Sequence, residues 1–600
     1  MKKYMLFLEL LILIFAFGCD LEEIPRSSTS KHAVFNSESG LQLYANSFYN
    51  WLPSANNIHQ NDYVSDYGAR RNVPSLIRKG VYSPNYTDDT SASGYERVAL
   101  GGDWDWGWTH LRNFNYFLEN NNSPNVSFEI RNHYNGLAKF FRAWFYFEKV
   151  KRYGDVPWIG KPLDVDDPIL WGGRDSRTIV MDSILADINY AIEHIRLEDD
   201  PSRTLVAKNV ARALKSRICL FEGTFRKYHT NYGLQNTANF WLTESASAAK
   251  DIIDSGAYSL YTGSGVDNSY RQLFINETPI SCEILMAIAC DLQLGVRHSA
   301  NWYLTSATTG VRFSFIRQFI HTYLNLDGTP FTNQENYEKK IFTEEMEGRD
   351  KRLEQTIRGT TYFRQKGGIL EPSPPAFTYT YTGYQPIKWV IDDVSVDGGS
   401  NNTNDVSLFR YAEVLLNYAE AKAELGSLTD ADWAMTIGAL RQRAGITGGI
   451  ATKPSVIDEY MQSVYFPDIN DPVILEIRRE RGIELALEGL RFYDIIRWKR
   501  GELFEMPWRG IYVPEADQYV DLNNDGILDV YFYTKKPSEQ VPGITYVNVA
   551  DESTRLTNGT FGELEWRYDV VREWEDKKYL YPIPEIHRLT NPNLGQNPGW

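Results

Sequence analysis

The amino-acid sequence predicts a mainly α-helical protein in which loops and short strands form one face. Apolar residues recur at three- and four-residue spacing through several long segments, which is the period of an α-helix. These segments are residues 130–153, 176–196, 205–227, 243–255, 408–425, 430–444 and 473–500. From about 257 to 407, and again from 505 to 575, this period gives way to Gly-, Tyr- and Thr-rich sequence, which is typical of long loops and short strands.

Small residues indicate how the helices pack. Glycines such as Gly154, Gly256 and Gly426 stand where helices need a C-terminal cap. Alanines allow two helices to approach closely at a crossing, and those concerned are Ala246, Ala248, Ala249, Ala419, Ala421 and Ala423. Such helices, joined by short turns, predict pairs of the tetratricopeptide type that stack into an α superhelix, although no repeat of fixed length is present.

The composition excludes some classes of partner. The chain of 600 residues is 42% hydrophobic and has a formal net charge of −16, so it can bury a large core and is acidic overall. We expect no nucleic-acid partner, because Lys and Arg have to neutralise the phosphates. The chain has 38 Tyr and 16 Trp, which are most useful where one edge of the ring is wet, so we expect a binding surface.

The first residues have the pattern of an export signal. Lys2 and Lys3 precede an apolar run at 10–17, which is too short to cross a bilayer that needs about 20 residues. A small residue before Cys19 predicts a lipoprotein signal peptide at residues 1–18, with a covalent lipid at Cys19 as the membrane anchor. The alternative is an ordinary signal peptide followed by an incidental cysteine.

The segment at 473–500 carries a row of charges. Glutamates recur every four residues at Glu476, Glu480, Glu484 and Glu488. Like charges stacked on one helix face cost roughly a few tenths of a kcal/mol per pair, so compensating cations are expected. The cations within helical reach, which can also pair with Asp494, are Arg479, Arg481, Arg491 and Arg497. We interpret the row as a partly buried structural ion-pair ladder and not as a set of catalytic carboxylates.

The sequence offers little that supports catalysis. GGDWDWGW (101–108) contains Asp103 and Asp105 among tryptophans, as a glycosidase cleft would, but their spacing does not fix the separation of the two carboxylates. No serine nucleophile elbow, phosphate-binding Gly-rich loop or HExxH sequence is present. We therefore expect a binding protein and not an enzyme.

Several motifs together resemble one known family. They are FFRAWFYFEKVKRYGDVPW (140–158), FRYAEVLLNYAEA (409–421), LRQRAG (440–445), EGLRFYDIIRW (488–498), and the YPIP and NPNLGQNPGW of the closing segment. In this order they resemble the SusD/RagB family, outer-membrane lipoproteins of Bacteroidetes. The DLEE that follows Cys19 resembles the acidic export tag that sends such lipoproteins to the cell surface.

The resemblance implies a SusD-like fold, with tetratricopeptide-type helix pairs under a loop-rich ligand face. It implies a nutrient-binding domain at 19–600, with an N-terminal part at about 19–320 and a C-terminal RagB/SusD part at about 321–600. It also implies that the closing segment, which ends in Trp600, packs back on the body of the protein.

The resemblance further implies a lipid-anchored protein, exposed on the surface of the cell outer membrane. Such a protein binds a glycan and delivers it to a SusC-like TonB-dependent transporter, over which it sits as a lid. Two alternatives stay open. One is a peptide-binding lid of a peptide importer, as in RagB, and the other is a tetratricopeptide-type scaffold that binds only protein.

Two loop stretches, NDYVSDYGARR (61–71) and RHSANWYLTS (297–306), are the candidate ligand face. Sugars present flat apolar faces edged with hydroxyl groups, so a site for them needs exposed rings and fixed hydrogen-bond donors. The residues that offer this mixture are Tyr63, Tyr67, Arg70, Trp302 and Tyr303. The alternative for each aromatic residue is that its ring packs on the scaffold.

The sequence DLNNDGILD (521–529) predicts a structural calcium site. Its ligands would be Asp521, Asn523, Asp525, the backbone carbonyl of Ile527, and Asp529. Calcium loops present hard oxygen ligands at alternate positions in this way, with a glycine at the sharp turn. The twelfth position is Phe532 instead of the glutamate of an EF-hand, so the alternative is an Asx-rich turn without a metal.

Overall fold

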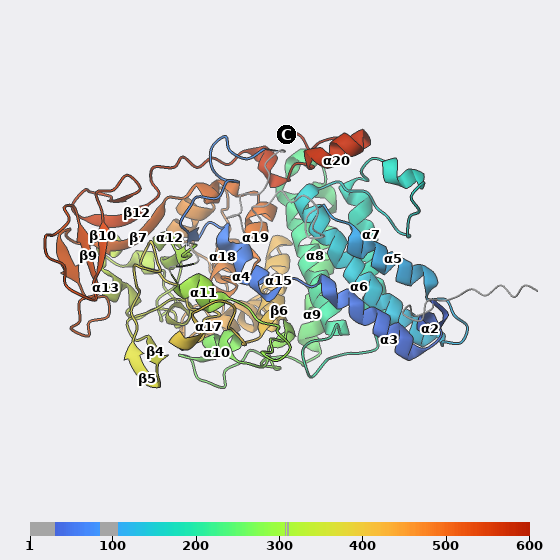
Figure 1. The fold of residues 1–600 in the computed structure, drawn as a ribbon, viewed down its shortest axis with the longest axis horizontal. Helices are drawn as coiled ribbons and strands as arrows, with labels where there is room; N and C mark the ends of the chain where they lie inside the picture. Colours follow the sequence, from blue (N-terminus) through green and yellow to red (C-terminus); the bar gives the residue numbers. More distant parts are fainter. Residues whose placement is uncertain (1–30, 84–105, 307, 309–310) are drawn as a thin grey trace, which may run out of the picture.

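A computed structural model of the chain describes residues 31–83, 106–306, 308 and 311–600. The predicted mainly α fold is confirmed, with long helices side by side at one end and short helices, loops and small sheets at the other (Figure 1). No helix in this part of the chain is long and apolar enough to span a membrane. The predicted signal peptide and Cys19 lie outside the described residues.

The N-terminal half is a layer of helices packed in pairs. Its helices are α2 (Lys31–Phe35), α3 (Glu38–Asn46), α5 (Thr109–Asn120), α6 (Phe128–Tyr153), α7 (Arg177–His194), α8 (Lys208–Tyr228) and α9 (Ala238–Asp254). α6 packs on α7, and α8 packs on α9, as predicted (Figure 1). Small residues allow this approach, since a Cβ added to Gly223 of α8 would lie 2.7 Å from Leu242 of α9. Ala246 and Ala249 of α9 are buried, as their spacing predicts.

The C-terminal half adds α15 (Tyr411–Glu424), α16 (Asp430–Trp433), a π-helical turn (Ala434–Gly438), α17 (Ala439–Arg443), α18 (Pro472–Glu484) and α19 (Arg491–Arg497). The prediction of one helix over 473–500 is wrong, because a turn separates α18 from α19. Leu487 and Gly489 in this turn have φ angles of 59° and 78°. Buried partners hold the turn: Trp389 Nε1 donates to Leu487 O (2.8 Å), and Gly489 N donates to Asp62 Oδ2 (2.8 Å).

The regions predicted as loops and short strands are confirmed as small sheets. The strands are β1 (Gly68–Ala69), β2 (Ile284–Ile288), β3 (Ser314–Phe315), β4 (Phe363–Lys366), β5 (Ile369–Pro372), β6 (Val406–Arg410), β7 (Trp508–Val513), β8 (Gln518–Val520), β9 (Val530–Tyr533), β10 (Thr545–Asn548), β11 (Thr554–Leu556) and β12 (Gly562–Trp566). The pairs are β1–β3, β2–β6 and β4–β5, and the three-stranded orders are β11–β12–β7 and β10–β9–β8. Between them lie α4 (Ala55–Gln60), α10 (Ser269–Ile275), α11 (Ala300–Thr305), α12 (Arg317–Ile320), α13 (Phe342–Met346), α14 (Arg352–Thr356) and α20 (Glu585–Thr590).

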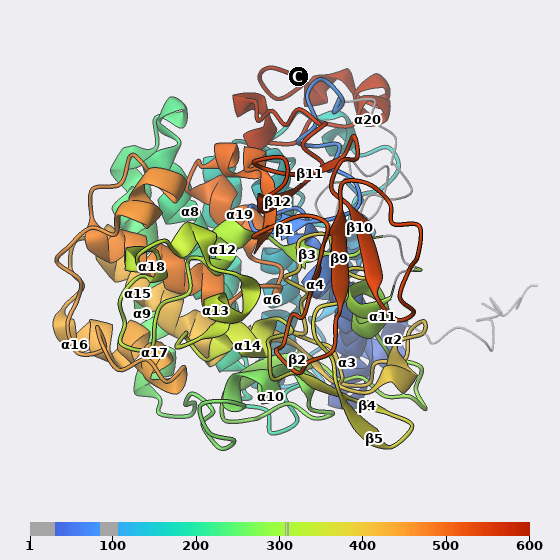
Figure 2. The ribbon, with the colours of Figure 1, turned by 90° about the vertical axis from the view of Figure 1, so that its left-hand side faces the viewer.

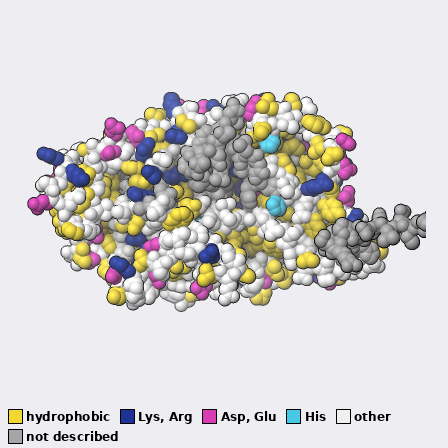
Figure 3. All heavy atoms as spheres, viewed as in Figure 1, with side chains coloured by type: hydrophobic (Ala, Val, Ile, Leu, Met, Phe, Trp, Pro, Cys, Tyr) yellow, Lys and Arg dark blue, Asp and Glu magenta, His cyan; other side chains and the backbone are white. Residues whose placement is uncertain are grey.

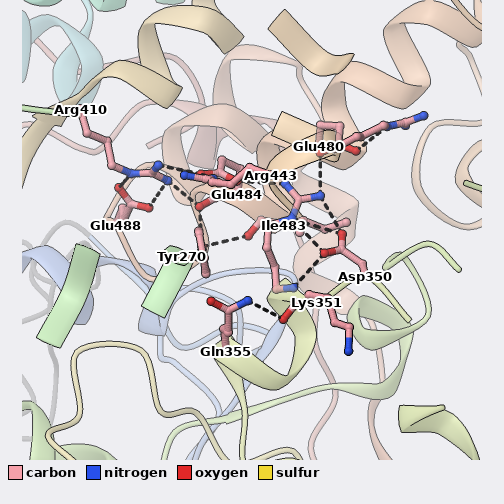
Figure 4. Close-up of polar contacts among 12 residues, drawn as sticks. Tyr270, Asp350, Lys351, Gln355, Arg410, Arg443, Glu480, Ile483, Glu484 and Glu488 are labelled. Carbon is pink, nitrogen blue, oxygen red and sulfur yellow. Dashed lines mark hydrogen bonds and ion pairs between the residues drawn. The ribbon is translucent and has the colours of Figure 1, made fainter. Parts of the chain in front are cut away.

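The predicted ion-pair ladder exists, and it is buried (Figure 4). The carboxylate of Glu484 accepts from Arg410 Nη1 (2.6 Å), Arg352 Nη1 (2.9 Å) and Arg443 Nη2. Burial alone would raise the pKa of Glu484, but these three guanidinium groups hold it well below its usual range. Most partners therefore come from other segments of the chain, and the expectation that the helix supplies its own arginines holds only for a minority, such as Arg479 with Glu476.

The closing segment packs against the body of the protein, as the resemblance implies. Tyr581 is buried, and Asn597 Nδ2 donates to the carbonyl groups of Tyr153 (3.0 Å) and Tyr581 (2.7 Å). Trp600 Nε1 donates to the carbonyl group of Leu580 (2.9 Å), and its ring lies 5.7 Å from that of Tyr82. These contacts fix the last residue of the chain to segments far away in the sequence.

Candidate functional site

The two predicted ligand stretches meet, but they meet inside the protein. The ring centroids of Tyr63 and Tyr303 are 6.3 Å apart, whereas Tyr63 and Tyr67 are only 1% and 0% exposed. Their hydroxyl groups also have internal partners: Tyr63 bonds His59 Nδ1 (2.9 Å), and Tyr67 accepts from Leu487 N (3.0 Å). The expectation that these two rings are exposed for stacking is wrong, because they form the core beneath the loops.

The other predicted contacts are distributed between interior and surface. Arg70 is buried, and its Nε donates to the carbonyl group of Asn72 (3.2 Å). Trp302 and Tyr303 on α11 are half-buried, and Trp302 Nε1 donates to Thr308 Oγ1 (2.7 Å). These two rings therefore stay predicted ligand contacts, since part of each is open to solvent.

A short antiparallel ladder brings two arginines together beside these stretches. β1 pairs with β3 in a register that places Ala69 opposite Ser314. The pairing continues beyond the strands, because Arg71 N donates to the carbonyl group of Val311 (3.0 Å), and this continuation sets Arg71 opposite Arg312. Arg71 is exposed and Arg312 is half-buried. Both guanidinium groups therefore stand at the same edge of the protein.

Two aromatic rings from distant segments stack at this edge. Tyr381 and Trp566 are half-buried, with ring centroids 4.2 Å apart and planes within 11° of parallel. The loop before β7 is tied to β3, because Tyr381 N donates to Ser314 Oγ (3.0 Å). β12 is tied to β1 by Trp566 Nε1, which donates to the carbonyl group of Arg70 (2.9 Å). Figure 2 shows β1, β3 and β12 close together near the middle of the view.

We name Arg71, Arg312, Tyr381, Trp566 and Arg567 the aromatic–arginine site. The guanidinium carbon of Arg312 lies 5.6 Å from the centroid of the Tyr381 ring. Burial raises the pKa of Tyr381 above its usual value, although the positive charges of Arg312, Arg71 and Arg567 act in the opposite direction. The Tyr381 hydroxyl group is therefore neutral at physiological pH and can donate a hydrogen bond. The site offers ring surface together with fixed donors, which is the chemistry that a sugar requires.

Sequence reasoning named only the edge of this site. Arg71 is the last residue of the predicted stretch NDYVSDYGARR, but Arg312, Tyr381, Trp566 and Arg567 were not predicted. The available signals were weak: three tyrosines in TYTYTGY (378–384) and an adjacent tryptophan and arginine in EWRYD (565–569). These residues become one site only through the pairing of β1 with β3 and the hydrogen bond of Trp566, neither of which a linear pattern reveals.

The predicted calcium loop has the hydrogen bonds of an Asx-rich turn. Asp521 accepts from Asn523 N (3.1 Å) and Gly526 N (2.8 Å), and Asp525 accepts from Ile527 N (2.8 Å). Burial, together with Asp521 and Asp525, raises the pKa of Asp529 to about 6. Among the residues that the structure describes, no three His, Cys, Asp or Glu side chains are arranged to hold a metal ion. Calcium at this loop stays a prediction, for which amide and carbonyl oxygens would have to complete the ligand set.

Two family models match the sequence. The model described as the SusD family matches residues 282–600, and a model described as starch-binding associating with outer membrane matches residues 21–220. SusD-like protein P2 of Formosa agariphila is 23% identical over 551 residues, which cover 88% of this chain and 96% of that protein. A SusD-like protein of Bacteroides ovatus is also 23% identical, with 100% of this chain and 98% of that protein covered.

Solved structures share the fold. A SusD-like protein from Bacteroides fragilis has a TM-score of 0.66 at 21% identity, with 97% of this chain and 100% of that chain covered. A SusD-like carbohydrate binding protein from the same species has a TM-score of 0.65 at 20% identity, with 94% and 99% covered. Together with a family model that matches more than half of the sequence, the motifs and the fold lead to one conclusion: the chain belongs to the SusD family.

Proposed function

We propose that this protein is a surface-exposed lipoprotein of the outer membrane that binds an oligosaccharide and delivers it to a SusC-like TonB-dependent transporter. The family models support binding and association with the outer membrane, and a solved neighbour is titled a carbohydrate binding protein. The proposal includes no catalytic step. It agrees with the relatives, which are described as binding proteins.

The observation that carries the proposal is the stacked pair of Tyr381 and Trp566 at the surface. An oligosaccharide would lay the apolar face of a sugar ring against the open part of these rings and receive hydrogen bonds from neighbouring donors. Arg71 and Arg312 supply guanidinium donors, and the neutral Tyr381 hydroxyl group supplies another. Trp302 and Tyr303, on the neighbouring α11, would extend the contact along the chain of a longer ligand.

The route of delivery is the part that the family resemblance supports. A lipid on Cys19 would hold the protein at the membrane, and the lid position over the transporter would place the captured ligand above the pore. Purification of the full-length protein from native membranes in mild detergent is expected to yield a SusC-like barrel with it. Recovery of the protein without any such barrel would contradict this part of the proposal.

The binding part is tested with paired variants and isothermal calorimetry of the full-length protein with oligosaccharides. Tyr381→Ala removes one ring of the stack, and loss of an aromatic contact weakens affinity by about tenfold. Trp171→Ala is the matched control, since Trp171 is 56% exposed outside the site. Unchanged affinity in Tyr381→Ala, with a melting temperature like that of the wild type, would exclude this site.

The same experiment separates the alternatives. If a panel of peptides binds and oligosaccharides do not, the protein is the peptide-binding lid of a peptide importer. If only proteins bind, it is a tetratricopeptide-type scaffold. Tyr381→Phe refines the result, because it removes the hydroxyl donor and keeps the ring.

A further inference from the structure

We propose that the aromatic–arginine site selects glycans that carry an acidic group, either a carboxylate or a sulfate ester. This inference rests on the proposed function, since it names the class of oligosaccharide that the same site takes. Its starting point is a local reversal of charge. The chain has a formal net charge of −16, yet Arg71, Arg312 and Arg567 gather around one aromatic pair.

The arginines of the site differ from the buried arginines in their partners. Arg352 bonds Asp350, Glu480 and Glu484, and Arg410 bonds Glu283, Glu484 and Glu488. Within the described residues, no carboxylate forms an ion pair with Arg71 or Arg312, and the buried Nε of Arg312 has no hydrogen-bond partner.

Arg567 has one carboxylate neighbour, Asp569, which lies 3.4 Å from its Nε. The site therefore has more positive charge than its own carboxylates neutralise. An external anion would complete the pairing.

The backbone carries costs at the same place. Arg71 and Arg312 lie opposite each other across the ladder, and like charges in that position are destabilising. Arg312 and Arg567 have φ angles of 47° and 55°, a left-handed conformation that a glycine adopts more easily. Local strain of this kind is typical of binding sites, where the side chain and not the backbone determines the residue.

The chemistry of the side chains indicates an acidic ligand. A guanidinium group presents paired N–H donors that match the two oxygens of a carboxylate or sulfate, and this geometry is stronger and more selective than a bond to a hydroxyl group. A neutral sugar would satisfy the rings and leave the charges unpaired. On the face drawn in Figure 3, Lys and Arg side chains lie mostly over the left-hand half, where β7, β9, β10 and β12 lie in Figure 1, so an anion approaching that side is attracted.

The test begins with the full-length protein on an array of uronate-containing, sulfated and neutral oligosaccharides, with a Glu-rich peptide as a non-glycan anion. Binding is expected for acidic glycans only. The best ligand is then compared by calorimetry with its uncharged form, made by methyl esterification of carboxylates or by desulfation, which tells the two anions apart. At least about tenfold weaker binding of the uncharged form is expected, since charge-assisted hydrogen bonds are lost.

Two arginine variants locate the effect. Arg71→Gln and Arg312→Gly are each expected to weaken the acidic glycan by about tenfold or more. Arg312→Gly should at the same time keep or raise the melting temperature, because glycine relieves the positive φ. Arg588→Gln on α20, which removes the same charge from a pair with Glu585, is the control and should bind as the wild type does.

The outcomes separate the two proposals. Equal affinity for charged and uncharged forms, or wild-type affinity in both arginine variants, would overturn the acidic selectivity and leave glycan binding in place. An array on which no glycan binds, or on which only the acidic peptide binds, would overturn the proposed function itself.

Discussion

Glu484→Gln is expected to destabilise the fold strongly, because one carboxylate serves three buried arginines. Arg352, Arg410 and Arg443 all bond Glu484, and all four side chains are at most 2% exposed. Each arginine keeps another partner, such as Glu283 for Arg410 and Arg443, so the substitution leaves one positive charge uncompensated in the interior. Breaking a buried ion pair costs about 3–5 kcal/mol. That is a large part of the roughly 5–15 kcal/mol that holds a domain folded.

The assay is urea unfolding followed by circular dichroism, with the free energy of unfolding extrapolated to water. Glu193→Gln is the matched control, since its side chain is 74% exposed, and a change within about 0.5 kcal/mol is expected there. A loss below about 1 kcal/mol in Glu484→Gln would refute the view that these charges are desolvated and depend on one another.

Three further predictions concern pH, calcium and location. Burial lowers the pKa of His59 and His229 to about 3, and of His298 and His321 to about 4. The unfolded chain therefore takes up protons near 6.5 that the folded chain refuses, so the free energy of unfolding should fall as the pH falls from about 6.5 to 4. The raised pKa of Asp62, about 7, acts in the opposite direction but is one group against four, and a stability that rises over this window would contradict the assignment. If the loop at 521–529 binds calcium, a chelator should lower the melting temperature of the wild type but not of Asp521→Asn with Asp525→Asn. Binding should also weaken as the pH falls through about 6, where Asp529 takes up a proton, and an equal chelator response in both proteins would exclude the site. Cys19→Ala should release the protein from the outer-membrane fraction, because the lipid supplies nearly all of its membrane affinity, and retention there would contradict the anchor.

Periodicity and family motifs were sufficient for the scaffold but not for the binding surface. The helix at 130–153 and the glycine that ends it follow from local sequence, and the structure has α6 over Phe128–Tyr153 with Gly154 as its cap. The break between α18 and α19 could not be predicted, because Asp62 and Trp389, both distant in sequence, hold the turn. Tyr63 and Tyr67 looked like surface residues because the stretch is polar, whereas tertiary packing on Phe313 and Phe319 buries both rings.

The most direct measurement is a crystal structure of the full-length protein with the oligosaccharide that binds best on the array. The account predicts a sugar ring against Tyr381 and Trp566, with an acidic group within hydrogen-bond distance of Arg71 or Arg312. A ligand bound elsewhere, for example on the row of Tyr519, Tyr531 and Tyr546 across β8, β9 and β10, would contradict it.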